Sequence, residues 1–362
     1  MKALSPTEVE ELKGIFKHLI SLDTSNPPGN ETEAAKYIGS LIDKHSIRSN
    51  VIESEPGRGN VISRIGKGQG RSLLFLGHLD VVPPGSLDNW EKPPFGAVEE
   101  EGRIYGRGAA DMKNIVAAQV LAFLKLAREG FEPKGCLILA QTADEENGGR
   151  KGAGFLAENF PELIRSNYCV TEGGGLVISG RAGRYVGYEV GEKGIFWVKL
   201  IFHGKGGHAS VPYILDNPVV KAARAVVNVG ETMELERFTE AGLDHLRAAV
   251  HAHGISNAKP GKTNYKELMN ELKKVDDFNW SRIRAQSAVT ATPTMISTGL
   301  RPNVAPPTAE VTVDCRLLPG VEKQEVERWL HEIAGTDCRI EEIAYSPASI
   351  SAIDEDFERA LR

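Results

Sequence analysis

The stretch GCLILAQTADEENGG (135–149) is the part of this chain that decides its fold. Its first part, 135–144, is a largely apolar run of strand length, which is typical of a strand buried within a sheet. Its second part places Glu145 and Glu146 where that strand ends. Adjacent carboxylates repel each other unless a cation or a proton neutralises them. The stretch therefore predicts a buried strand that ends either in a cation site or in a solvated acidic loop.

Helix and strand signals alternate on both sides of that stretch. Apolar runs of strand length and segments of helical periodicity follow one another through the first half of the chain. This order implies an α/β domain with a largely buried sheet. The expected helices cover 6–21, 32–46, 113–129 and 151–159, and the expected strands cover 49–54, 60–65, 72–82, 135–144 and 167–173.

A different pattern begins beyond the alternating region. GIFWVKLIFHG (194–204) alternates with period two, as a strand with one buried face does. The order from there is β-α-β-β-α-β, which predicts a small ferredoxin-like α+β domain. We expect this domain, 192–344, to be inserted into a larger one formed by 1–191 and 345–362. A polar, partly helical insertion, 231–288, interrupts it and has no assigned role. The later elements are expected at 215–229 and 321–334 (helices) and at 292–299, 309–319 and 337–344 (strands).

Composition restricts the class of protein. The 362 residues suffice for two domains at roughly 100–200 residues each. A net charge of −6 argues against nucleic acid or an anionic membrane as the main partner. The sequence contains no apolar run of the ~18 residues that a membrane helix needs. The N-terminal MKALSPTEVEELKGIFKHL predicts an amphipathic helix capped by Ser5 and Glu8, not a signal peptide. We therefore expect a cytoplasmic protein.

Two segments that precede the strand expected at 135–144 carry metal-binding residue types. GHLDVVPPG (77–85) places His78 and Asp80 two residues apart at a strand end, so period two puts both side chains on one side. A metal-bound imidazole needs its other ring nitrogen fixed, often by a carboxylate. The alternative is that both residues simply meet solvent. Asp111 in GRGAADMKN (106–114) lies just ahead of a helix, where an ordinary N-cap is the alternative to a metal ligand.

A fourth segment, NYCVTEGGG (167–175), ends another predicted strand with Glu172, for which a plain loop acid is the alternative. All four segments lie at the carboxyl ends of predicted strands or in the loops that follow. Ligands of open α/β sheets bind at that edge. One histidine with several carboxylates suits a borderline or hard divalent ion. Their joint placement favours a metal site over four unrelated loops.

The order and spacing of these segments resemble a co-catalytic zinc family. It comprises aminoacylase, acetylornithine deacetylase, succinyl-diaminopimelate desuccinylase and carboxypeptidase G, and the resemblance covers nearly the whole chain. It implies a three-layer α/β/α catalytic domain with a mixed sheet, and an inserted lid domain through which two copies dimerise. It also implies two Zn²⁺ ions per subunit, which Co²⁺ or Mn²⁺ can replace.

The resemblance assigns roles to the first group of site residues. It implies that His78 and Glu172 bind one ion, that Asp80 orients His78, and that Asp111 bridges the two ions. It also implies a cis peptide bond between Asp111 and Met112.

The resemblance makes Glu145 the general base and Glu146 a ligand of the second ion. The implied reaction is hydrolysis of an amide bond in an N-acyl amino acid or small peptide. Glu145 would activate a water that bridges the metals and would then return the proton to the leaving amine. The chain would thus be a deacylase, exopeptidase or dipeptidase.

The inserted domain also resembles the family. GKGGHASVP contains His208, which the resemblance predicts to reach the active site of the partner copy as an oxyanion donor. In RPNVAPPTAEVTVDCRLLPG (301–320), Asn303 is expected to bond the scissile carbonyl or the tetrahedral intermediate. Arg316 is expected to hold a substrate carboxylate. Because Asp314 shares its strand face, an internal salt bridge is the alternative for Arg316.

The family pattern ends with one more metal ligand, a histidine near the C-terminus. No histidine follows His331, which lies in a predicted lid helix. We therefore expect the second ion to lack one ligand and the catalytic domain to be truncated at its C-terminal part. His251 or His253 of the insertion are the alternatives for that ligand. A catalytically impaired, dimeric homologue that binds metal or peptide is the alternative function.

Overall fold

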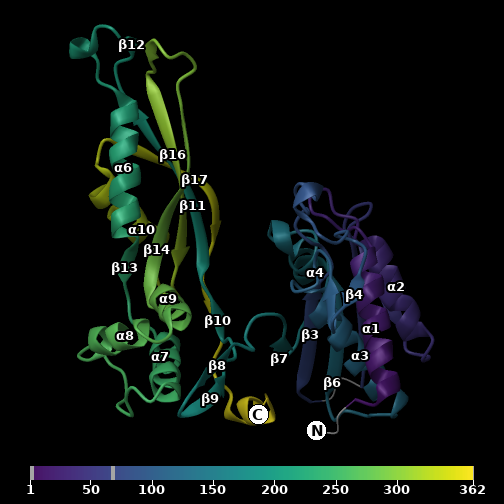
Figure 1. The fold of residues 1–362 in the computed structure, drawn as a ribbon. Helices are drawn as coiled ribbons and strands as arrows, with labels where there is room; N and C mark the ends of the chain where they lie inside the picture. The colour runs from purple at the N-terminus through teal and green to yellow at the C-terminus, as the bar shows by residue number, and fades with distance from the viewer. Residues whose placement is uncertain (1–3, 67–69, 362) are drawn as a thin grey trace. The chain divides into compact units, whose positions relative to one another are not determined.

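A computed structural model describes residues 4–66 and 70–361. The chain divides into two compact units, Met1–Glu172 and Gly173–Arg362 (Figure 1). Within the described residues, no helix combines the length and the apolar character needed to cross a membrane. The assignment of 173–191 and 345–362 to the catalytic domain stays a prediction.

The first unit is built on a mixed five-stranded sheet. Its strand order is β1-β2-β6-β3-β7, in which β6, β3 and β7 run parallel and β1 and β2 pair antiparallel. The strands are β1 (Ser49–Glu53), β2 (Gly59–Ile65), β3 (Ser72–His78), β6 (Cys136–Thr142) and β7 (Tyr168–Val170), with a separate hairpin of β4 (Val98–Glu100) and β5 (Arg103–Tyr105). The helices are α1 (Pro6–Ser21), α2 (Thr32–Asp43), α3 (Lys113–Arg128), α4 (Ala153–Asn159) and α5 (Pro161–Ile164).

Strand β6 explains the layering of this unit, because every one of its residues is buried. Leu137 and Leu139 face a core shared with α1, α2 and α3. Ile138 and Ala140 point to the other face, where they join a core with Leu156 of α4. Because successive side chains of β6 point to opposite faces of the sheet, this one strand packs against helices on both faces. The predicted three-layer α/β/α arrangement with a mixed sheet is confirmed.

The second unit contains an antiparallel sheet of order β13-β14-β16-β11-β17. Helices α6 and α10 contribute to the core on one face, which includes Phe196, Val198 and Leu200 of β11. Without the short β13, the element order is the β-α-β-β-α-β that the sequence predicts. The elements are β11 (Gly194–His203), α6 (Pro218–Thr232), β13 (Glu234–Glu236), β14 (Ala288–Thr298), β16 (Thr308–Leu317), α10 (Lys323–Ala334) and β17 (Cys338–Ser346).

The insertion 231–288 forms a helical layer with a core of its own. Leu246, Leu272 and Ile283 are fully buried there and join Ile178 from β8. Its helices are α7 (Glu240–Ala252), α8 (Tyr265–Lys273) and α9 (Asp277–Gln286). The remaining elements of this unit are β8 (Val177–Gly180), β9 (Gly183–Val186), β10 (Gly191–Glu192), β12 (Gly207–His208), β15 (Val304–Ala305), β18 (Ser349–Ile350) and α11 (Glu355–Leu361).

Candidate metal centre

His78 ends β3, the strand between β6 and β7 in the sheet. It is 2% exposed, and Asp80 just beyond the strand is fully buried. His78 Nδ1 lies 3.0 Å from the carbonyl oxygen of Asp80 and 3.4 Å from its Oδ1. The two side chains thus lie together, as their spacing predicts, and the ring directs Nε2 toward the neighbouring carboxylates.

Asp111 lies in the loop that enters α3. Met112, not Asp111, takes the N-cap position of that helix, and no side chain caps it. Asp111 Oδ1 instead lies 3.0 Å from His78 Nε2. The backbone N–H of His78 donates to Met112 Sδ at 3.1 Å, which ties the loop to the strand end. The Asp111–Met112 peptide bond is cis, as the resemblance implies.

Glu145 and Glu146 lie in a short 3₁₀ turn, Glu145–Asn147, directly after β6. Asp80 accepts their backbone N–H groups, that of Glu145 on Oδ1 at 3.0 Å and that of Glu146 on Oδ2 at 3.1 Å. Burial acts to raise the pKa of Asp80, but hydrogen bonds from His78 and Asn26 outweigh it and hold that pKa below its ordinary value. One ionised carboxylate therefore orients the histidine and also fixes the turn that carries both glutamates.

Glu172 follows β7 and completes the cluster. Its Oε1 lies 3.5 Å from His78 Nε2, and Glu145 Oε2 lies 3.9 Å from the same atom. Two groups of possible ligand atoms each fall within 4.8 Å: those of His78, Asp111 and Glu146, and those of His78, Glu145 and Glu172. The carboxyl ends of β3, β6 and β7 thus bring four of the predicted site residues together, and the loop before α3 adds Asp111.

The cluster concentrates negative charge around one imidazole. Burial acts to lower the pKa of His78, but Asp80 and Glu172 outweigh it and raise that pKa to about 11. Burial raises the pKa of Glu145 to about 7. The charge of His78 acts to lower this pKa, and the charge of Glu172 acts to raise it. Such a site favours a positive charge at its centre. An imidazole nitrogen and several carboxylate oxygens are donors that suit a borderline or hard divalent ion. The residues present therefore fit a divalent metal.

Lys113 supports the position of Asp111, a role that was not identified from the sequence. It is fully buried, and its Nζ donates to the carbonyl oxygens of Leu19 and Leu22 at 2.9 Å each. Burial lowers its pKa to about 8. These bonds join the end of α1 to the start of α3, next to Asp111. The only sequence signal for Lys113 was its position two residues after Asp111, a candidate ligand.

The candidate substrate residues His208 and Asn303 lie together in the second unit. His208 pairs with Val304 in the two-residue ladder of β12 and β15, and the N–H of Ala209 donates to the Asn303 carbonyl at 3.0 Å. His208 Nδ1 lies 2.7 Å from Ser210 Oγ. Both candidates are exposed, and β12, which contains His208, lies at the end of the second unit away from α7, α8 and α9 (Figure 1).

Arg316 lies near the carboxyl end of β16. Thr308 pairs with His203 and Arg316 with Ile195, so Thr308 and Arg316 are eight residue steps, or about 26 Å, apart along β16. Its Nε and Nη2 donate to Asp314 Oδ1 and Oδ2 at 2.8 and 3.0 Å. The internal salt bridge that the sequence left open is therefore present.

The alternative histidines have other contacts. His251 Nδ1 meets the hydroxyl of Tyr185, and His253 Nε2 lies 2.7 Å from Asp276 Oδ2. His331 lies on α10, with Nδ1 3.8 Å from the Cys338 sulfur. None of the three belongs to a metal-ligand group within the described residues.

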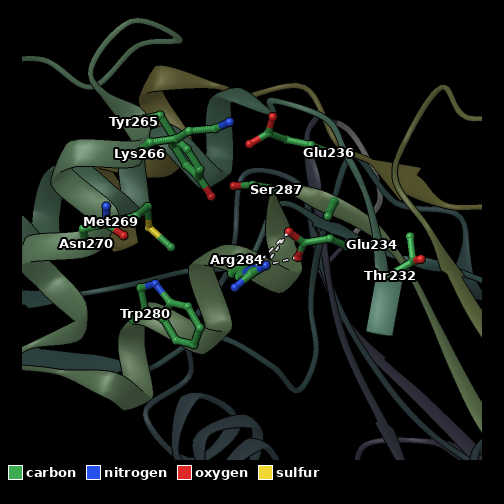
Figure 2. A pocket seen from close by; sticks show the side chains of 11 residues that line it. Thr232, Glu234, Glu236, Tyr265, Lys266, Met269, Asn270, Trp280, Arg284 and Ser287 are labelled. Atoms are coloured by element: carbon green, nitrogen blue, oxygen red, sulfur yellow. Dashed lines mark hydrogen bonds and ion pairs between the residues drawn. The ribbon is translucent and has the colours of Figure 1, made fainter. Parts of the chain in front are cut away.

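The insertion also contains a cavity of about 440 Å³ (Figure 2). The side chains of Glu234 and Arg284 form an ion pair across it, and Trp280 and Tyr265 contribute aromatic walls. None of its lining residues belongs to the metal-ligand groups found in the described chain. Sequence reasoning did not predict this cavity.

Comparisons with known proteins agree with the chemistry of the cluster. The model of peptidase family M20/M25/M40 matches residues 74–345. A probable succinyl-diaminopimelate desuccinylase of Staphylococcus aureus is 28% identical over 327 residues, covering 90% of this chain and 72% of the relative. A succinyl-diaminopimelate desuccinylase of Alkalilimnicola ehrlichii is 36% identical over 223 residues, covering 61% of this chain and 56% of the relative.

A solved structure agrees with the fold. An M20 family metallo-carboxypeptidase from Sulfolobus solfataricus superposes with a TM-score of 0.70 at 20% identity, covering 99% of this chain and 82% of the other. At that identity the likeness concerns the fold alone.

Proposed function

The chain belongs to peptidase family M20/M25/M40, and from this premise we propose that it hydrolyses an amide bond in an N-acyl amino acid or small peptide, with zinc as its metal. Membership makes it a metallo-hydrolase of the peptidase type. The observation that carries the finer proposal is the meeting of His78 with the carboxylates of Asp111, Glu145 and Glu172 at one sheet edge.

The residues of the centre divide the work in this proposal. Bound ions would lower the pKa of a coordinated water and polarise the substrate carbonyl. His78, Asp111, Glu146 and Glu172 would hold the ions. Glu145 takes a proton from the attacking water and returns it to the leaving amine. The position of Glu145 beside His78 supports this role, and burial acts to raise the pKa of Glu145, which favours uptake of the proton.

Asp80 keeps this base in place. Its carboxylate accepts the N–H groups of Glu145 and Glu146 and lies beside His78 Nδ1. The proton acceptor and two of the proposed ion ligands, His78 and Glu146, are thus held to one buried side chain. Such preorganisation lets the reacting atoms meet without rearrangement of the site.

We further propose that the enzyme is a homodimer whose lid residues serve two different sites. A dipeptide spans about 7 Å at most, whereas about 26 Å of β16 separates Arg316 from Thr308, the residue at the end of β16 that follows the β12–β15 ladder. As the family resemblance implies, His208 would act on the substrate of the partner copy, while Asn303 would bond the scissile carbonyl and Arg316 would hold a substrate carboxylate. Exposed apolar side chains support pairing: Val220 and Val227 of α6 are 45% and 53% exposed, and Tyr213 is 96% exposed.

Metal removal tests the proposed reaction. Treating the protein with a chelator should abolish hydrolysis of a panel of N-acyl amino acids and dipeptides, and Zn²⁺, Co²⁺ or Mn²⁺ should restore it. Hydrolysis that persists in the chelator would contradict the proposal. Metal analysis separates the alternative function: about two ions per chain support the enzyme, whereas one or none supports an impaired binding homologue.

A further inference from the structure

A buried polar network lies directly behind the turn of Glu145 and Glu146. None of its residues is more than 4% exposed. Its members are Asn26, Glu31, Arg58, Asp80 and Asp144.

Arg58 joins two buried carboxylates of this network. Its Nε and Nη2 donate to Glu31 Oε2 and Oε1 at 2.9 and 2.8 Å, and Nη2 also donates to Asp144 Oδ1 at 3.0 Å. Space for the guanidinium depends on Gly29, since a Cβ there would lie 2.4 Å from Arg58 Cζ. The absence of a side chain at Gly29 therefore leaves room for the guanidinium of Arg58 to donate to both Glu31 and Asp144.

Asp144 is the residue through which Arg58 meets the metal centre. It immediately precedes Glu145 and has a φ of 70°, a left-handed conformation that is uncommon outside glycine. Its Oδ1 accepts from Arg58 and Asn26, and its Oδ2 accepts the N–H of Lys151 at 3.0 Å. Side-chain bonds on both oxygens thus hold this backbone turn in place.

Asn26 links Asp144 to Asp80. Its Nδ2 donates to Asp80 Oδ2 at 2.8 Å and to Asp144 Oδ1 at 3.1 Å. Its own Oδ1 is buried and has no hydrogen-bond partner among the described residues. Rotation of the amide would turn that oxygen toward two carboxylates, so their charges dictate its orientation. The amide thereby separates two buried like charges at the base of the turn.

We propose that Arg58 is a positioning residue of the metal centre, which acts through Asp144 to hold Glu145 and Glu146 at their places beside Asp80. The inference rests on the proposed function, because it assumes that this cluster binds metal. Partners that orient metal ligands typically contribute about 10–100-fold to metal affinity. Loss of the Arg58 anchor should therefore weaken metal binding by about that factor.

The alternative is an ion pair that only stabilises the fold. Removing Arg58 alone would leave Glu31 buried and unpaired, which destabilises strongly. The double variant Glu31→Met/Arg58→Met replaces the pair by apolar side chains, an exchange that is often neutral for stability. It still deprives Asp144 of its guanidinium partner. Adding Asp144→Asn gives a triple variant without an unpaired charge, for use if the double variant unfolds.

The matched control is the pair of Arg128 and Glu11, in which Arg128 Nη1 donates to Glu11 Oε2 at 2.8 Å. It belongs to the same unit but has no contact with the network in the described chain. The control variant is Glu11→Met/Arg128→Met.

The experiment measures Co²⁺ affinity of the whole chain by visible absorption in competition with a chelator, together with thermal unfolding. We expect about 10–100-fold weaker Co²⁺ binding and an altered absorption band in the network variant that folds, and wild-type binding in the control. Wild-type affinity in a folded network variant, or equal weakening in the control, would overturn the proposal. If the wild-type chain itself binds no Co²⁺, the proposed function fails and this inference with it.

Discussion

The two units hold their candidate functional side chains in opposite ways. In the first unit, His78 and Asp80 are buried at a strand end, and hydrogen bonds to Asp80 hold the loop that bears the glutamates. In the second unit, His208 and Asn303 are exposed beside a ladder of two residue pairs. Ion ligands must keep fixed mutual distances, and buried partners supply that rigidity. Side chains that approach a substrate need access to solvent instead.

Replacement of Glu145, the proposed base in the first unit, should have the largest effect. We expect Glu145→Gln to lower kcat by about 10²–10⁴-fold, because the amide cannot accept the proton of the attacking water. Metal content should not change, since Asp80 holds the turn through its backbone. Steady-state kinetics and metal analysis of the same preparation measure both. The exposed Glu158→Gln is the control, and full activity of Glu145→Gln would contradict the assignment.

Mixed dimers test the role of His208, the exposed candidate of the second unit. We expect Glu145→Gln and His208→Ala to be almost inactive alone. If His208 serves the partner copy, equal mixing after subunit exchange should restore about a quarter of the wild-type activity, because half of the dimers are mixed and each has one intact site. A mixture that stays as inactive as its components would place His208 in the site of its own chain.

Arg316 tests whether a half-buried residue acts on substrate although it is paired with Asp314. We expect Arg316→Ala to raise KM by about 10–100-fold for substrates with a free carboxylate, with a smaller effect on esters of the same substrates. Removal of Asp314 alone should not reproduce this pattern, and Asp314→Asn serves as the control. An equal KM change for acid and ester would show that the salt bridge matters only for structure.

The smallest effect concerns Lys193, a half-buried lysine of the second unit. Lys193 Nζ donates to the carbonyl oxygens of Ala285 and Ala288 at 2.8 Å each. Burial lowers its pKa from 10.5 to about 8. Between these values the unfolded chain binds a proton that the folded chain does not, so the free energy of unfolding should rise with pH.

We expect Lys193→Met to remove about 1–2 kcal/mol of this rise between pH 8 and 10.5. Denaturant unfolding at several pH values measures it, with Lys199→Met in the following strand β11 as the control. Lys113 shifts in the same direction in the first unit, so part of the rise should persist. An unchanged pH slope in Lys193→Met would contradict the expectation.

Much of the fold was predictable because local chemistry and tertiary structure agree. Ser5 and Glu8 form the capping box expected at the start of α1. The apolar run 135–144 contains β6, and the period-two run 194–204 contains β11. Strong patterns of this kind persist when elements pack, because burial of the apolar face is what packing requires. Helix ends were less accurate: the helix expected at 215–229 spans Pro218–Thr232.

The sequence by itself determined which residues could form a metal centre, since strand ends carry ligand types in a specific order. Only the tertiary structure decided how they are held. Asn26, Arg58 and Asp144 lie far apart in the chain, and no periodicity marks them as partners. The physical reason is that a buried charge needs a partner from anywhere in space, whereas a strand or helix is encoded by its neighbours. Glu145 and Glu146, visible at once in the sequence, are thus positioned by residues that only folding reveals.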